Sequence, residues 1–149
     1  MSNVELHRTV RERLARRDQR YTTGRRQIVE ALVADGPITL PALLSRQPSL
    51  AQSSAYRNLS AMEEAGVVRR LVHGTDYAHY ELAEDLTEHH HHLICEQCGV
   101  VRDIILAGRL EHSLGTAFDE LASLHDFVPR HHIIDIYGRC ADCSGGLST

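Results

Sequence analysis

The residues best suited to chemistry in this 149-residue chain are its four cysteines, which form two Cys-x-x-Cys pairs. The first pair is Cys95 and Cys98, and the second is Cys140 and Cys143. Two such pairs supply four thiolates, which can close a tetrahedral shell around zinc with no position left for a substrate. The spacing therefore predicts a structural Zn²⁺ rather than disulfides, with free core cysteines or a redox pair as the alternatives.

A run of four histidines, His89 to His92, lies directly before the first cysteine pair. On a strand, successive side chains point to opposite faces, so His90 and His92 share one face and His89 and His91 share the other. Two such pairs can feed two separate cation sites. Imidazole suits zinc, iron, nickel, copper or manganese, so the pairs alone do not select the metal. A solvated surface run is the alternative, and the adjacent cysteines favour ligands.

Further donors for a cation are scattered over the second half of the chain. His79 and Glu81 share one face of a short predicted strand, and Asp103 follows the first cysteine pair by five residues. Glu111 lies on a predicted helix, and His132 opens the last predicted strand. Their nitrogen and oxygen atoms are suitable ligands for a divalent cation. An exposed polar strand, a sheet-edge charge and an exposed helix acid are the ordinary alternatives.

A predicted helix over Gln52–Ala65 carries groups that recognise nucleic acid. Its apolar residues lie on one side, which leaves Ser54, Tyr56 and Arg57 pointing outward. Hydroxyl, phenol and guanidinium groups contact phosphates and base edges when a helix enters the major groove of DNA. A solvated helix face is the alternative, and the basic surroundings favour DNA contact.

Charge divides the chain into two unlike halves. Residues 1–72 hold twelve arginines against seven acids, about +5, whereas residues 73–149 hold four against thirteen, about −9. Ten of the eleven histidines lie in the acidic half. The division predicts polyanion binding by the first half and cation binding by the second. Arg20 and Arg25 are candidate contacts to phosphate or the minor groove.

Composition excludes several classes of protein. The chain is 42% hydrophobic and 24% charged, which is typical of a globular protein. No apolar run approaches the roughly 18 residues that cross a bilayer, and the arginine-rich N-terminus lacks the apolar core of a signal peptide. We therefore expect a cytoplasmic protein that makes no contact with a membrane.

Apolar spacing and capping residues predict the elements that position these side chains. The expected helices are Val4–Arg17, a second beginning at Thr22 or Thr23 and ending at Asp35, a short one capped by Thr39, and Gln52–Ala65. Strands Val67–Val72 and Tyr77–Leu82 flank a turn at 73–76, and helices followed by a hairpin are typical of a winged helix-turn-helix. Strands at 89–95, 100–106 and Ile133–Tyr137, with a helix at 109–124, predict a small α/β domain. The expected fold is α+β, with a winged-helix domain at 1–82, a connector at 83–88 and the second domain at 89–149.

Taken in order, these motifs resemble the ferric uptake regulator (Fur) superfamily of bacterial metal-responsive repressors. The resemblance covers about residues 6–144, and the histidine run joined to a Cys-x-x-Cys pair is its specific part. The matching segments are 20–28, 54–59, 66–68, 80–82, 89–99 and 132–143.

The resemblance implies a winged-helix domain, a hinge and a dimerisation domain that holds the four-cysteine zinc. A regulatory cation near the hinge would set the angle between the two DNA-binding domains of a homodimer. By position, its ligands would be Glu81, His90 and His92, with Asp103 matching the acid of the peroxide-sensing branch. A second site would use His89, His91, Glu111 and His132. Tyr56 and Arg57 would read bases, and Arg20 would approach the minor groove.

The sequence departs from the family at the hinge. Several branches place a histidine near the position of Pro37, and this chain has none there. Arg69 occupies the position matched to a ligand aspartate of the zinc-sensing branch. His79, or with less support His73, is the candidate replacement. Zinc and ferrous iron are the leading effectors, while manganese and nickel remain open.

These features together predict a metal-dependent repressor, not an enzyme, whose cation acts as corepressor and closes a homodimer onto a palindromic operator in double-stranded DNA. A peroxide-, nickel- or manganese-sensing member is the alternative within the superfamily. A zinc hydrolase would need an open zinc position beside a general base. A metal-storage protein would leave the outward Tyr56 and Arg57 unexplained.

Overall fold

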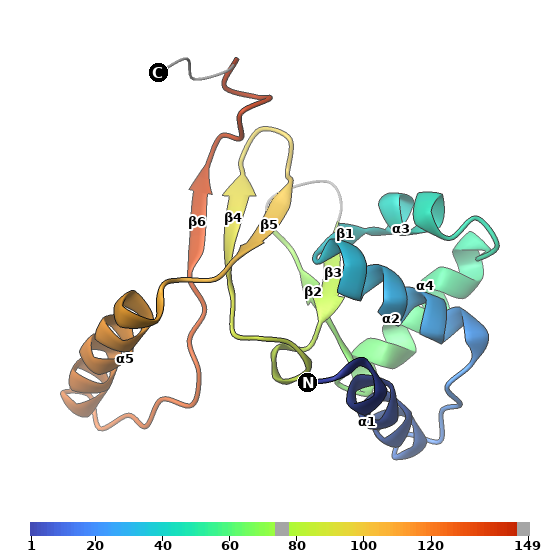
Figure 1. The fold of residues 1–149 in the computed structure, drawn as a ribbon, viewed down its shortest axis with the longest axis horizontal. Coiled ribbons are helices and arrows are strands. Elements are labelled where there is room, and N and C mark those ends of the chain that lie inside the picture. Colours follow the sequence, from blue (N-terminus) through green and yellow to red (C-terminus); the bar gives the residue numbers. More distant parts are fainter. Residues whose placement is uncertain (74–77, 146–149) are drawn as a thin grey trace.

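The computed structural model describes residues 1–73 and 78–145, which form a helical part with a small sheet and a second sheet with one helix (Figure 1). Each part combines helical structure with a small sheet, so the chain has the predicted α+β fold. Four helices make up the first part: α1 (Asn3–Ala15), α2 (Thr23–Asp35), α3 (Leu40–Arg46) and α4 (Gln52–Glu64).

Side-chain caps begin three of these helices. Ser2 and Glu5 form a capping box at the start of α1, while Thr22 and Thr39 accept backbone N–H groups at the starts of α2 and α3. The two threonines are among the capping residues that the sequence predicted. The inner faces of the helices meet in one core, whose most buried members include Leu14, Ile28, Leu43, Leu59 and Met62.

A three-stranded antiparallel sheet completes the winged helix. Its order is β1 (Ile38–Thr39), β3 (His79–Leu82), β2 (Val68–Leu71). The two-residue strand β1 is absent from the predicted elements because so short a pairing leaves no periodic pattern. Of the predicted turn at 73–76, only His73 lies within the described residues.

The connector at 83–88 contains one short helix, η1 (Glu84–Leu86). The guanidinium of Arg13 donates to the carbonyl oxygen of Gly66 and to the carboxylate of Asp85. One α1 side chain therefore ties the C-terminal end of α4 to the connector.

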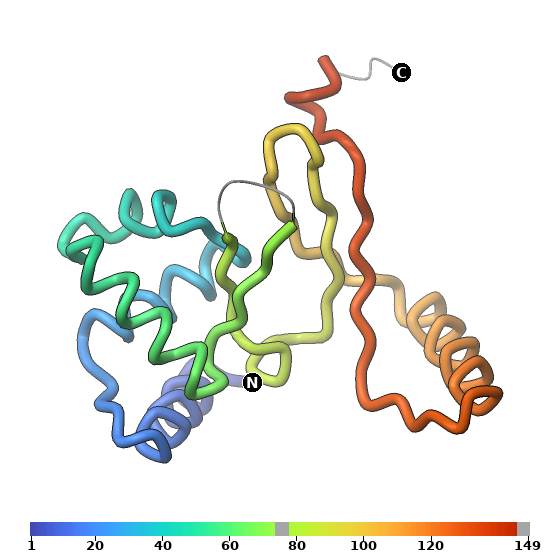
Figure 2. The backbone as a smooth tube through the Cα atoms, turned by 180° about the vertical axis from the view of Figure 1, so that it is seen from behind, coloured from blue at the N-terminus to red at the C-terminus, as the bar shows by residue number. Residues whose placement is uncertain are grey.

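The second sheet has the order β5 (Val101–Ile104), β4 (His91–Cys95), β6 (Asp135–Gly138). Strand β4 is antiparallel to β5 and parallel to β6, and Figure 2 shows the three running side by side next to the winged helix. Helix α5 (Gly108–Ser123) extends away from the helical part (Figure 1). Large apolar side chains are exposed on α5 and directly after it: Leu110, Leu121, Leu124 and Phe127. Among the described residues, no helix is long and apolar enough to cross a membrane.

Candidate metal centres and DNA-binding face

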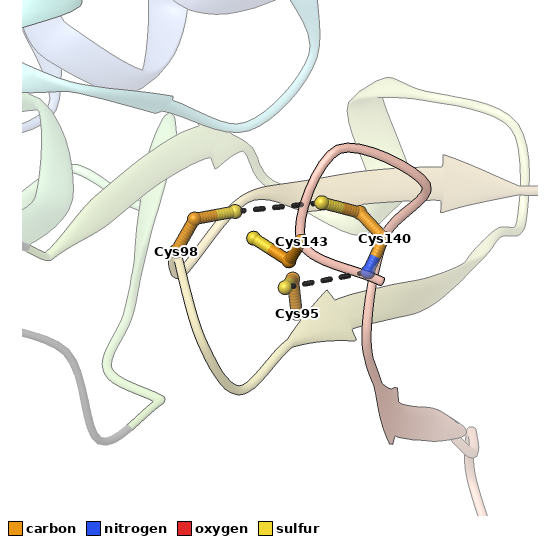
Figure 3. A group of neighbouring side chains, drawn as sticks. All are labelled: Cys95, Cys98, Cys140 and Cys143. Atoms are coloured by element: carbon orange, nitrogen blue, oxygen red, sulfur yellow. Dashed lines mark hydrogen bonds between the residues drawn. The ribbon is translucent and has the colours of Figure 1, made fainter. Parts of the chain in front are cut away.

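Four cysteine thiols meet where β4 and β6 end. Cys95 is the last residue of β4, and the chain turns back through Gly99, whose φ of 74° is a conformation that favours glycine. Cys140 and Cys143 follow β6. The four side chains point toward one another (Figure 3), and their sulfur atoms all lie within 4.8 Å of one another.

The sulfur spacing fits zinc. The Sγ atoms of Cys98 and Cys140 are 3.7 Å apart. A tetrahedral shell with Zn–S bonds of about 2.3 Å has edges of about 3.8 Å, whereas a disulfide is about 2.05 Å long. The geometry therefore matches the predicted zinc shell and not a disulfide.

The pKa values of thiols in this cluster also favour a bound cation. The backbone N–H groups of Cys140 and Cys98 lower the pKa of the Cys95 thiol to about 6. The neighbouring Cys140 sulfur raises the pKa of Cys143 to about 12. Four thiolates can coexist here at neutral pH only when a cation compensates their charge.

A second cluster joins the wing to the second sheet. It contains Glu81 of β3, Asp103 of β5, and His90 and His92, with ligand atoms within 4.8 Å of one another. Oε2 of Glu81 lies 3.1 Å from Nε2 of His92 and 3.5 Å from Nε2 of His90. Oδ1 of Asp103 lies 3.8 Å from the first nitrogen and 4.0 Å from the second. We call these four residues the hinge cluster.

The other ring nitrogens of the hinge-cluster histidines are held by hydrogen bonds. Nδ1 of His90 is 2.8 Å from the carbonyl oxygen of Glu88, and Nδ1 of His92 is 2.8 Å from Oδ1 of Asp135. Because both acceptors require a proton on Nδ1, the lone pair of each Nε2 is directed into the cluster. Imidazoles oriented in this way are suited to bind a divalent cation.

In the hinge cluster, burial and the neighbouring charges shift the pKa values of the side chains in opposite directions. Burial lowers the pKa of His92, but its contacts with Glu81 and Asp135 outweigh that effect and raise the pKa. Burial likewise raises the pKa of Glu81, and His92 and Arg69 reverse the shift to a net lowering. For Asp103 burial prevails, and its pKa is raised. The cluster thus contains partly compensated negative charge.

Neither candidate for the missing hinge ligand belongs to the hinge cluster. His79 is 7% exposed, and its Nδ1 has no partner among the described residues. It faces a cavity bordered by the chain at 35–39 and at 98–101. His73 instead contacts Tyr137 of β6, with its Nδ1 3.1 Å from the hydroxyl oxygen. Near Pro37, Gly36 lies so close to the hinge cluster that a β-carbon on it would be 3.0 Å from Oδ2 of Asp103.

A third cluster contains His89, His91, Glu111 and His132. Strand β4 begins at His91 and not at residue 89 as predicted, so strand alternation separates His91 from His92, whereas His89 and His90 precede the strand.

Glu111 of α5 is at the centre of the third cluster: its carboxylate oxygens are 3.1 Å from Nε2 of His89, 3.0 Å from Nε2 of His91 and 2.8 Å from Nε2 of His132. The backbone N–H of Ile134 donates to Nδ1 of His91 over 3.1 Å. Because Nδ1 accepts this hydrogen bond, the proton of the neutral His91 ring is on Nε2. A cation that binds Nε2 must therefore displace that proton. We call these four ligand residues the α5 cluster.

The outward face of α4 is exposed at two of its three candidate DNA contacts. Tyr56 is 59% exposed, Arg57 is exposed and Ser54 is half-buried. All three lie in the first turns of the helix. Arg20, in the loop that precedes α2, is also exposed. The helix can therefore offer these side chains to a groove of DNA.

Arg25 is different from the other candidate DNA contacts. It is only 8% exposed, and its guanidinium donates to Oδ1 of Asn58, the carbonyl oxygen of Arg20 and Oε1 of Gln19. Each guanidinium nitrogen therefore has a partner inside the domain, and Arg25 supports the loop before α2 and α4. Its contact with DNA stays a prediction.

The comparisons with known proteins agree with this geometry. The sequence model of the ferric uptake regulator family matches residues 16–137. The peroxide-responsive repressor of Staphylococcus saprophyticus is 29% identical over 83% of this chain and 82% of its own. The peroxide operon regulator of Bacillus subtilis is 32% identical over 69% of this chain and 66% of its own.

Among solved structures, the Helicobacter pylori ferric uptake regulator, described as having three functional metal-binding sites, covers 99% of this chain and 97% of its own. The TM-score is 0.74 at 19% identity, which supports a shared fold. With the family match spanning most of the sequence, this chain belongs to the ferric uptake regulator family.

Proposed function

We propose that this protein is a homodimeric transcriptional repressor whose DNA binding requires a divalent cation in the hinge cluster. One observation carries the proposal: the cluster takes Glu81 from the wing of the winged helix and its other donors from the second sheet and the segment leading into it. A cation bound by all four residues would fix the winged helix relative to the rest of the subunit. It acts as corepressor to the extent that it prefers the DNA-binding arrangement.

The remaining parts have separate roles in this proposal. Zn²⁺ in the four-cysteine shell is structural, because four thiolates leave no position for a substrate, and the protein is not an enzyme. The exposed apolar side chains around α5 supply the surface for a second subunit. Tyr56, Arg57 and Ser54 contact the operator, with Arg20 near the minor groove. The α5 cluster is a second cation site, and the protein acts in the cytoplasm.

The test is fluorescence anisotropy of chelator-treated protein on DNA from its own upstream region. Zinc, ferrous iron, manganese and nickel are titrated separately at fixed salt, because protein–DNA affinity depends strongly on salt. We expect one cation to tighten binding selectively. An identical curve for all four cations and for the metal-free protein would contradict the corepressor role.

Matched variants separate DNA contact from cation sensing. Arg57→Ala should abolish operator binding while leaving metal content intact, and Arg109→Ala, which removes the same charge from exposed α5, should bind normally. His90→Ala should bind the operator no more tightly with the cation than the metal-free protein does. His112→Ala, an exposed histidine of α5, serves as its control.

Peroxide sensing is a second candidate. Two imidazoles with two carboxylates form a nitrogen–oxygen donor set that accepts ferrous iron, and the relatives cited above are peroxide-responsive repressors. In that case hydrogen peroxide should abolish operator binding by the ferrous protein and leave the manganese form unaffected. Equal resistance of both forms would exclude this function.

A further inference from the structure

The carboxylate of Glu81 is divided between two kinds of partner. Nε of Arg69 donates to its Oε1 over 2.8 Å, and a second guanidinium nitrogen of Arg69 contacts the same oxygen. The other oxygen, Oε2, faces His90 and His92. The two residues are paired directly across β2 and β3, so the sheet itself fixes this contact.

Because Glu81 is buried, its carboxylate needs the positive charge of Arg69 when no cation is bound. The side chain of Glu81 is 3% exposed and that of Arg69 is 28% exposed. A buried carboxylate without a partner is costly, so the guanidinium stabilises the cation-free hinge cluster. Arginine keeps its charge at every physiological pH. A permanent positive charge therefore lies beside the place where a divalent cation would bind.

We propose that Arg69 sets the cation affinity of the hinge cluster, acting as a built-in counter-ion that competes for Glu81 and repels the incoming metal. The inference rests on the proposed function, in which the hinge cluster is the regulatory site. Arg69 holds Oε1, so the cation receives one oxygen of Glu81 instead of two. It also supports the cation-free state, which lowers the gain from binding.

This role predicts the sign of a substitution. Arg69→Gln removes the repulsion and leaves Glu81 needing a positive partner, so the cation should bind about tenfold more tightly or better. A purely structural role predicts the reverse, because a disordered ligand binds metal less well. Arg69→Lys keeps the charge and should remain close to the wild-type affinity.

The experiment measures Mn²⁺ binding to the zinc-loaded full chain by the electron paramagnetic resonance signal of the free ion. Arg70→Gln is the matched control, since Arg70 is the next residue of β2, is exposed and lies opposite Tyr80. His90→Ala identifies the binding phase that belongs to the hinge cluster. The same variants are melted with and without Mn²⁺, and Arg69→Gln should lose stability mainly in the Mn²⁺-free state.

The outcomes separate this inference from the function on which it rests. Tighter binding in Arg69→Gln, absent in Arg70→Gln and abolished by adding His90→Ala, supports the inference. Equal or weaker binding in Arg69→Gln overturns it while leaving the regulatory site in place. Mn²⁺ binding that is identical in wild type and His90→Ala overturns the assignment of the hinge cluster, and the inference with it.

Discussion

His73 and Tyr137 join the two parts of the molecule through a hydrogen bond of 3.1 Å between Nδ1 and the phenolic oxygen. His73 follows β2 of the wing, and Tyr137 lies in β6 of the second sheet. Asp135, two residues before Tyr137, lies 3.9 Å from Nδ1 of His73 and also holds His92. The wing is therefore connected to a hinge-cluster histidine by a route that does not require the cation.

Removing this hydrogen bond should loosen the arrangement of the two parts. Tyr137→Phe leaves the ring but deletes the hydroxyl, so the wing loses a direct tie to β6. We expect a broader distribution of distances between spin labels on α2 and α5, measured by double electron–electron resonance without added cation. Tyr56→Phe, which removes an exposed hydroxyl from α4, should leave the distribution unchanged. Equal distributions for wild type and Tyr137→Phe would show that the contact does not restrain the wing.

Loss of the four-cysteine zinc should destabilise the second sheet. Cys98→Ser removes one of the four ligands that tie the end of β4 to the end of β6. Because metal binding to such a shell adds directly to folding, we expect a loss of about 3 kcal/mol or more, or about 10 °C in Tm. Zinc content and thermal melting are the measurements. Ser144→Ala, a nearby hydroxyl outside the shell, is the control, and full zinc content in Cys98→Ser would refute the ligand set.

We expect Arg25 to stabilise the winged helix through its internal hydrogen bonds rather than through its charge alone. Arg25→Met leaves the acceptors on Asn58 and Gln19 without their donor inside the winged helix. We expect the free energy of unfolding to fall by about 2–4 kcal/mol, measured by urea denaturation. The neighbouring Arg26 is exposed, so Arg26→Met removes the same charge at little cost. Similar effects of the two substitutions would contradict the structural role.

His7 should make the winged helix sensitive to acid. Burial lowers the pKa of His7 below its ordinary value, and its Nδ1 is hydrogen-bonded to the hydroxyl of Tyr21. The folded state therefore binds this proton less readily than the unfolded state. The contribution is complete above about pH 6.5 and is lost as the pH falls below it.

The measurement is the change in Tm between pH 7.5 and 5.5 for wild type and His7→Asn. Asparagine can still accept from Tyr21 but does not titrate, so the variant should lose less stability on acidification. His112→Asn, at an exposed position of α5, should behave like wild type. An equal loss in wild type and His7→Asn would rule out His7 as the source.

Short-range pattern was enough to predict the grouping of the donors. The sequence pairs His90 with His92 and His89 with His91, and the structure has these pairs in two clusters, although only His91 and His92 lie within β4. Cysteine spacing likewise predicted the four-thiol shell. These features depend on the geometry of one strand, of the residues just before it and of two tight loops, which the sequence encodes locally.

Long-range contacts were not predictable in the same way. The hydrogen bond from His92 to Asp135 depends on the parallel register of β4 and β6, and no local pattern specifies that register. Arg25 has no local signal that sets it apart from the other arginines of the basic half, because its partner Asn58 lies on α4, 33 residues along the chain. His79 shares a strand with Glu81, yet its surroundings come from β1 and the loop after β4, which only the tertiary fold brings together.

The segment 89–95 contributes a donor to each of the three clusters, and this has a genetic consequence. Substitution of a histidine or of Cys95 in this segment removes one donor. Leu93, which is 41% exposed, belongs to none of the clusters, so its substitution removes no donor. Deletion of a single codon between His92 and Cys95 would instead turn His91 and His92 to the opposite faces of β4 relative to the cysteine pair. The hinge cluster and the α5 cluster would then each lose a donor in one event. The gene should therefore accept missense changes at position 93 far more readily than any in-frame change in the length of this segment.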